Sequence, residues 1–471
     1  MNPPAGSASP ALRLHTPDGA AGRPAWLAVT LSPSVLTTVT VVGIAALAGA
    51  VGADGRWLAA LGAFITRHGT IPAGVPFAAA PTAHWHNAIV LAELVFHGLE
   101  VALGDRGLVL AQLVAVATTM VVLIRDARAA GASEKGAGTA VLIAAVGAGP
   151  ALVIARVQLF SLILFVSLMA LLRAETRRPS RRVWFVLPLI ALWSNLHGAV
   201  LIGVGVTLAY LFLDRFRQQR WTAIGVAAGA LVALCMTPAG LGTIDYYRGL
   251  LTNAAAARGA GLWGPLSLSA PLDIVLVLVA LALGVQLWRA KPALWELGVA
   301  AALAIATVKA SRSGVWLVFF LAVPAARSFR TVRLWDWVMP PVATLALIGL
   351  VAGSARGPVT NGAGAALLTR AVSLADGTPI MADDLIDEQV ALAGGRIWVG
   401  NPIDAFSKRD QMTYLDWLAG QRSGLRALGH NVHVVLTGRA TDAERLMAAD
   451  PQFANVGSDK RAELFIRVAV R

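Results

Sequence analysis

The chain has 471 residues, of which 57% are hydrophobic and only 14% are charged. About a quarter of the residues of a soluble globular protein are charged, so this composition excludes that class and indicates a polytopic membrane protein. The net charge of +13 does not indicate nucleic-acid binding, because the basic residues lie in short loops between apolar runs. A single cysteine, Cys235, excludes a disulfide framework.

Five short basic loops interrupt the apolar runs and determine the predicted topology. Cytoplasmic loops of membrane proteins are enriched in Lys and Arg, so an even number of crossings must separate each basic loop from the next. The five loops contain Arg125, Arg128 and Lys135; Arg173, Arg177, Arg178, Arg181 and Arg182; Arg215, Arg217 and Arg220; Arg289 and Lys291; and Arg327, Arg330 and Arg333.

This condition predicts an α-helical membrane domain over 26–353 with about 11 transmembrane helices. An odd number of crossings puts the N-terminal tail, 1–25, in the cytoplasm and the C-terminus outside a bacterial inner membrane. The first apolar run is long enough to stay as an anchor, and no cleavable signal peptide is evident. The predicted spans are 33–53, 107–124, 137–155, 157–172, 183–195, 198–213, 221–237, 272–288, 293–308, 314–326 and 334–353.

The first outer loop, 54–106, follows the first span. It begins with Asp54 and ends in the apolar stretch 87–104, which the parity condition excludes as a span. Glu93, His97 and Glu100 form one polar stripe in this stretch at helical spacing. The stretch is therefore predicted to be an amphipathic helix on the outer surface.

Two pairs of predicted spans are too short to cross the membrane and return. Only 31 residues, 183–213, lie between two basic loops. Two helices of about 15 residues reach about 22 Å each, less than a hydrocarbon core of about 30 Å. The turn with Asn195 and His197 should therefore lie below the outer interface, as should the turn with Arg156 and Gln158. Polar turns at that depth survive where they line a cavity or are buried in protein.

Two further segments lie outside the membrane pattern. An outer loop of mixed polarity spans 238–271. From 354 to 471, short β runs alternate with charged helical stretches, which predicts a small extracytoplasmic α/β domain. The β runs are Pro379–Ala382, Arg396–Val399, Val432–Leu436 and Leu464–Val468.

The order of several outward motifs resembles that of the GT-C membrane glycosyltransferases, and more closely a family of bacterial GT-C-like membrane proteins with a soluble C-terminal domain. The motifs extend over nearly the whole chain. Family members commonly carry a Trp-His pair after the first acid and a second Asp after the Ile-Pro turn, where this chain has Arg56-Trp57 and Gly74-Val75. The matched motifs are Asp54, Gly69–Pro72, Arg156 with Gln158, Trp193–Gly198, Thr237–Gly240, and Ile403-Asp404 near Tyr414.

This resemblance implies a transferase that moves a sugar from a polyprenyl-phosphate donor to an envelope acceptor on the outer face. In that superfamily this Asp is the catalytic or substrate-orienting acid. Asp54 is therefore expected to be the catalytic residue, a base that takes a proton from an acceptor hydroxyl, with Arg56 and Arg156 close to its carboxylate. No metal ligand set is assigned, although a divalent metal stays open as a cofactor. The expected partners are the bilayer and the polyprenyl-phosphate-linked sugar, not nucleic acid. The substrate-binding candidates are Arg156, Gln158, Asn195, His197, Lys309 and Arg312.

Two other functions stay open. The missing second acids favour a non-catalytic membrane scaffold or envelope assembly factor whose tail binds a partner. A transporter is the second alternative, but transporters usually show internal repeats and polar groups near the middle of their helices.

Overall fold

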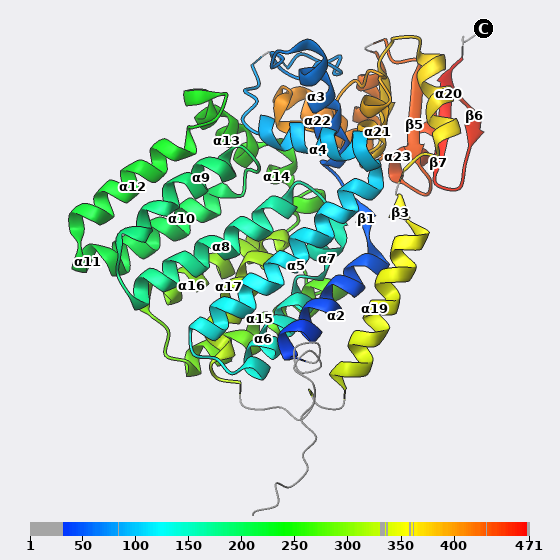
Figure 1. Cartoon of the computed structure of the whole chain (residues 1–471). Helices are drawn as coiled ribbons and strands as arrows, with labels where there is room; N and C mark the ends of the chain where they lie inside the picture. Colours follow the sequence, from blue (N-terminus) through cyan, green and yellow to red (C-terminus); the bar gives the residue numbers. More distant parts are fainter. Residues whose placement is uncertain are drawn as a thin grey trace, which may run out of the picture.

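The computed structural model describes residues 32–82, 84–329, 335, 338–357, 359–360, 362–429 and 431–468. Most of them form a helical bundle, and a smaller α/β unit, called the tail domain below, lies at one end of it (Figure 1). The predicted cytoplasmic tail, 1–25, lies outside the described residues, as do Arg330 and Arg333 of the last basic loop and part of the start of the last predicted span.

Each of the eleven predicted spans contains a helix. Four of these helices, α5, α8, α15 and α19, are long and apolar enough to cross a membrane. The others are shorter, and the number of crossings stays a prediction. The helices are α2 (Pro33–Ala48), α5 (Asp105–Ala129), α6 (Glu134–Gly147), α8 (Gln158–Arg177), α9 (Val186–Ser194), α10 (Val200–Tyr210), α12 (Arg220–Leu234), α15 (Pro271–Arg289), α16 (Leu294–Lys309), α17 (Gly314–Ala326) and α19 (Met339–Arg356).

Three of the basic loops contact one another at the end of the bundle far from the tail domain (Figure 1). Arg173 pairs with Asp126 at 3.0 Å and with Glu296 at 3.2 Å, so the helix ends of α5, α8 and α16 meet there. Arg215 donates to the Ser180 carbonyl at 2.7 Å. These charges are buried and paired, which is the condition for stable burial of an ion.

Two helices of the predicted first outer loop, called the first outer segment below, lie across the opposite end beside the tail domain (Figure 1). They are α3 (Gly55–His68) and α4 (Val90–Leu103). Helix α4 coincides with the predicted surface helix, but Glu93 is fully buried and accepts a hydrogen bond from Asn87 at 2.8 Å. Helix α3 therefore covers the predicted polar stripe at Glu93. Gly62 of α3 permits this close packing, since any side chain there would collide with the Glu93 backbone.

The tail domain has one four-stranded sheet in the order β4-β5-β7-β6. Strands β4 and β5 are parallel, and the other neighbours are antiparallel. Its strands are β4 (Ile380–Ala382), β5 (Val434–Gly438), β6 (Phe453–Ser458) and β7 (Ala462–Arg467), and its helices are α20 (Ala365–Ala375), α21 (Ile386–Leu392), α22 (Lys408–Leu418) and α23 (Asp442–Ala448).

A second, three-stranded sheet joins the bundle to the tail domain. Its central strand β1 (Ala50–Val51) follows α2, and it pairs in parallel with β2 (Ile154–Ala155) and β3 (Val359–Thr360). Helices α2 and α19 pack side by side and lead into β1 and β3 (Figure 1). Gly43 and Gly353 permit this close approach, since a Cβ at either position would meet the backbone of the other helix.

The remaining helices are short and connect these elements. They are α7 (Gly149–Val153), α11 (Phe216–Gln218), α13 (Thr243–Thr252) and α14 (Ala254–Arg258). Helices α13 and α14 belong to the predicted outer loop and lie near the tail domain (Figure 1). Gln411 of α22 accepts from the Ala254 amide at 2.7 Å, and Arg258 pairs with Asp416 at 2.7 Å, so this loop is docked on α22.

Candidate functional site

A cavity of about 770 Å³ opens where the bundle, the first outer segment, the α13–α14 loop and the tail domain meet. Asp54, Arg156, Gln158, His197 and Arg312 all line it. Five of the seven site residues predicted from sequence are thus brought together from four separate regions of the chain. Asn195 and Lys309 are not among the described residues that line it.

Asp54 lies three residues after β1, at the N-cap position of α3. Its φ is +80°, a left-handed conformation that costs a residue with a Cβ about 1 kcal/mol, although Asp tolerates it better than most. Its side chain does not cap the helix. Instead the carboxylate accepts from Trp57 Nε1 at 3.2 Å and from Arg156 Nη2 at 3.4 Å.

The pairing register of the small sheet brings Arg156 to Asp54. Ala50 lies opposite Ile154, and Val51 opposite Ala155, in parallel strands. Both strands therefore end at the same edge of the sheet. Asp54 follows β1 there, and Arg156 follows β2. Arg56, the other expected neighbour of Asp54, instead pairs with Asp105 at 2.8 Å and is buried. The reason is the helical spacing of α3, which turns residue 56 away from the side that residue 54 faces.

Arg312 forms the second cationic group on the cavity wall. It lies in the turn between α16 and α17, and its guanidinium stacks over the Trp263 ring at 3.5 Å from the ring centre. Such a contact fixes the direction of the guanidinium and leaves its N–H edges free to bind an anion. Lys309, at the end of α16, is exposed outside this wall.

His197 lies in a short chain of hydrogen bonds. Trp193 Nε1 donates to Ser161 Oγ at 2.6 Å, and Ser161 Oγ lies 2.6 Å from His197 Nδ1. When the Ser161 hydroxyl donates to Nδ1, a neutral His197 carries its proton on Nε2. Asn195 serves a structural role, because its amide donates to the Ala191 and Met236 carbonyls at 2.8 and 2.7 Å.

The tail domain contributes a third set of cavity residues, Asp384, Asp387, Asn401, Asp404 and Tyr414. Asp404 and Tyr414 belong to a motif matched in the sequence but were not predicted as site residues, and no matched motif contained the other three. Asp384 and Asp387 follow β4, the edge strand of the tail sheet that pairs in parallel with β5. A short β run followed by acids is the signal that could have indicated them, since ligands commonly bind beyond the carboxyl ends of parallel strands.

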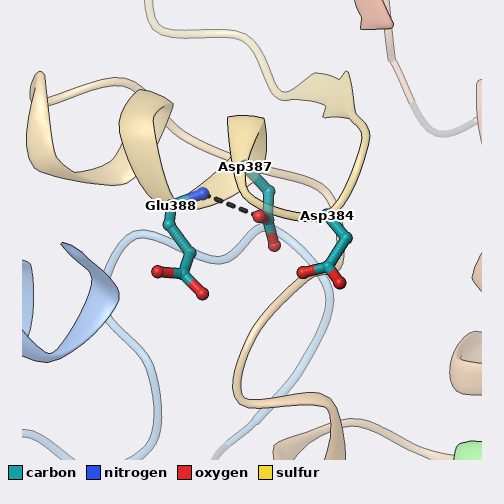
Figure 2. A group of neighbouring side chains, drawn as sticks. All are labelled: Asp384, Asp387 and Glu388. Atoms are coloured by element: carbon teal, nitrogen blue, oxygen red, sulfur yellow. Dashed lines mark hydrogen bonds between the residues drawn. The ribbon is translucent and has the colours of Figure 1, made fainter. Parts of the chain in front are cut away.

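Asp384, Asp387 and Glu388 form a close group whose carboxylates point to the same side of α21 (Figure 2). Burial, and then the charge of Asp54, raises the pKa of Glu388 to about 8. Burial, and then the charge of Glu388, raises the pKa of Asp387 well above its ordinary range. Like charges this close cannot all ionise, so the group holds at least one proton at neutral pH.

The spacing of this group would also admit a divalent cation, with candidate ligand atoms within 4.8 Å of one another. Hydrogen bonds occupy part of its acceptor capacity. Glu388 Oε1 accepts from the Asp54 amide and from the Asn401 side chain, which uses both of its lone pairs. Glu388 Oε2 and the two oxygens of Asp387 each accept one backbone amide and keep a lone pair for a cation.

An aromatic wall lies beside the acids. Trp85 Nε1 donates to Asp404 Oδ2 at 3.0 Å, and the Trp85 and Tyr246 rings meet edge to face at 6.4 Å between centres. All three residues line the cavity. Burial raises the pKa of Asp404 to about 6, although the Trp85 hydrogen bond opposes this shift. A flat ring next to a carboxyl group is suited to a polar ring such as a sugar.

Comparison with known proteins identifies the fold. No protein-family model matches the sequence, and no curated protein matches it. ArnT from Cupriavidus metallidurans is similar in structure, with TM-scores of 0.54 in the apo state and 0.52 bound to undecaprenyl phosphate. Identity is 14%, and the match covers 94% of this chain and 98% of ArnT. The arabinofuranosyltransferase AftD from Mycobacteria has a TM-score of 0.51 at 14% identity, over 94% of this chain and 41% of AftD.

Both are GT-C membrane glycosyltransferases. This chain has a GT-C-like fold. The expectation drawn from the order of the sequence motifs is thus confirmed for the fold.

Proposed function

We propose that this protein is a membrane glycosyltransferase that moves a sugar from a polyprenyl-phosphate donor to an envelope acceptor on the outer face. The observation that carries the proposal is the Asp54–Arg156 pair on the wall of a cavity of about 770 Å³. The GT-C-like fold, shared with a protein whose structure contains undecaprenyl phosphate, supports it.

The chemistry needs a base and an anion site. Asp54 takes the proton from an acceptor hydroxyl, whose oxygen then bonds to the anomeric carbon of the sugar. The bond from that carbon to the phosphate oxygen breaks, and its electron pair leaves with the polyprenyl phosphate. Arg156 and Arg312 stabilise the charge on the leaving phosphate, since guanidinium groups bind phosphate oxygens through paired N–H donors.

The sugar would lie between the arginines and the tail domain. Trp85 and Tyr246 offer ring faces, and Asp404 offers a carboxyl oxygen to sugar hydroxyls. His197, with its proton on Nε2, would donate to a phosphate or sugar oxygen, and Gln158 would complete the wall beside Arg156.

The test uses a strain that lacks the gene and carries either the wild-type protein or Asp54→Asn. This substitution keeps the size of the side chain and removes its basicity, so transfer should fall about 10²- to 10⁴-fold. We expect the envelope glycan product to disappear and the lipid-linked sugar to accumulate, both measured by mass spectrometry. Expression and membrane insertion should not change.

Asp245→Asn is the matched control, because Asp245 is an exposed carboxylate of the same outer face and does not line the cavity. It should retain wild-type product. Wild-type product in Asp54→Asn would remove Asp54 as the base and favour the alternative of a non-catalytic scaffold or envelope assembly factor.

A further inference from the structure

Glu388 holds the backbone of Asp54 from outside the cavity. It lies on α21 of the tail domain, 334 residues further along the chain, and is itself buried. Its Oε1 accepts from the Asp54 amide at 2.7 Å, and its Oε2 accepts from the Arg56 amide at 3.1 Å. Glu388 is not among the described residues that line the cavity. It therefore contacts the segment that carries Asp54 without contacting the space where a substrate would bind.

These two hydrogen bonds replace a local helix cap. The first amides of a helix have no partner within it, and a side chain at the N-cap position usually accepts one of them. In α3 the Asp54 side chain does not do so. The carboxyl group of Glu388 accepts the Arg56 amide in its place.

The carboxyl groups of Glu388 and Asp54 therefore have different roles. Because Glu388 supplies the cap, the Asp54 carboxylate is free to turn to Arg156 and Trp57. The left-handed backbone of Asp54, with φ of +80°, persists only where surrounding contacts hold it, and the hydrogen bond from its amide to Glu388 is one of these contacts. Asn401 in turn donates to Glu388 at 2.8 Å and fixes its side chain.

We propose that Glu388 is a positioning residue for Asp54, so that the tail domain is needed to assemble the catalytic site. This inference rests on the proposed function, because it assumes that Asp54 is the base. It adds that catalysis depends on a carboxyl group that touches neither donor nor acceptor, and that a tail domain detached from its docking place would leave Asp54 misdirected.

The test compares full-length Glu388→Gln and Glu388→Ala with the wild type. The amide side chain of the first variant would retain one acceptor oxygen and present an NH₂ group to the second amide donor. One bond is therefore lost in Glu388→Gln and both in Glu388→Ala. Glu444→Gln is the matched control, because Glu444 also accepts a backbone amide in the tail domain, that of Ala440, and is not among the described residues that line the cavity. Three quantities are measured: glycan product, affinity for undecaprenyl phosphate, and amide hydrogen exchange of the segment 53–58.

We expect exchange at Asp54 and Arg56 to become about tenfold faster in Glu388→Ala and to change less in Glu388→Gln. Product should fall about 10²-fold in Glu388→Ala, as for a base displaced by about 1 Å. The dissociation constant for undecaprenyl phosphate should not change, because Arg156 and Arg312 are untouched. Glu444→Gln should match the wild type in all three measurements. A merely structural role would lower lipid affinity together with product.

Three outcomes overturn the inference: unchanged exchange at Asp54 and Arg56, wild-type product in both Glu388 variants, or parallel loss of lipid affinity and product. Asp54→Asn is measured in the same series. If it lacks product and the Glu388 variants do not, only the positioning role fails. If Asp54→Asn retains product, the proposed function fails, and the positioning role fails with it.

Discussion

Individual residues at this site owe their properties to neighbours that are remote in sequence. Arg56 is only two residues from Asp54 in the chain, yet the ion-pair partner of Asp54 is Arg156, while Arg56 pairs with Asp105. Glu388 shows the same effect on a pKa. Burial, and then the charge of Asp54, raises the pKa of Glu388 to about 8, although hydrogen bonds from the Asp54 amide and the Asn401 side chain favour its ionised form.

The raised pKa of Glu388 predicts a dependence of stability on pH. The folded state keeps a proton that the unfolded state releases at the ordinary pKa of 4.5. This contribution is complete below that value and is lost as the pH rises through about 8. We therefore expect the detergent-solubilised protein to have a lower melting temperature at about pH 8.5 than at about pH 5.5.

Asp387 shares this behaviour, so Glu388→Gln should reduce the difference between the two pH values without abolishing it. Glu444→Gln should leave the difference as in the wild type. An equal difference in Glu388→Gln and the wild type would contradict the raised pKa.

At the scale of elements, two-residue strands determine the site more than the long helices do. The parallel pairing of β1 with β2 and β3 joins the end of α2, the turn before α8 and the connection from α19 to the tail domain. Gly52 follows β1 and donates its amide to the Ala155 carbonyl at 3.0 Å. A Cβ at Gly52 would collide with Ile154 and approach the Arg156 side chain to 3.1 Å.

Gly52→Val should therefore displace Arg156 without breaking the fold, because the atoms it meets belong to side chains that can move. We expect the dissociation constant for undecaprenyl phosphate to rise about tenfold, equivalent to about 1.4 kcal/mol. Gly98→Val is the control, since a Cβ at this exposed glycine of α4 would meet no atom of another segment within 4 Å. Unchanged affinity in Gly52→Val would exclude Arg156 as a phosphate ligand.

At the scale of the whole molecule, the two ends of the helical bundle differ in their charged residues. Buried ion pairs join the basic loops at one end, and the cavity, the outer segment and the tail domain lie at the other (Figure 1). The positive-inside rule assigns the basic end to the cytoplasm. This assignment is a prediction that labelling can test, because the native chain has only one cysteine, Cys235.

In a Cys235→Ser background, a membrane-impermeant maleimide should label Asp245→Cys and Arg445→Cys in intact spheroplasts. Both positions are exposed, one in the outer loop and one in the tail domain. Arg178→Cys, in a basic loop, should react only after the membrane is permeabilised. Labelling of Arg178→Cys in intact cells would reverse the predicted orientation.

Composition and periodicity by themselves determined the helical regions of this protein and indicated several of the residues that line its cavity. Apolar runs and basic loops are local signals, so each predicted span contains a helix, and polar residues in short helical turns such as Arg156 and His197 indicated the cavity. The order of the motifs also indicated the GT-C-like fold.

Only the tertiary structure decided what faces Asp54. Nothing within a window of a few tens of residues relates Glu388, Asp384 or Asn401 to Asp54, because the register of a two-residue strand pairing and the docking of the tail domain bring them together. Asn195 was predicted at the site since it lies beside His197, but its amide is directed to backbone carbonyls. The direction of a side chain depends on the hydrogen-bond partners that neighbouring segments provide. Local periodicity does not specify which remote segments pack together.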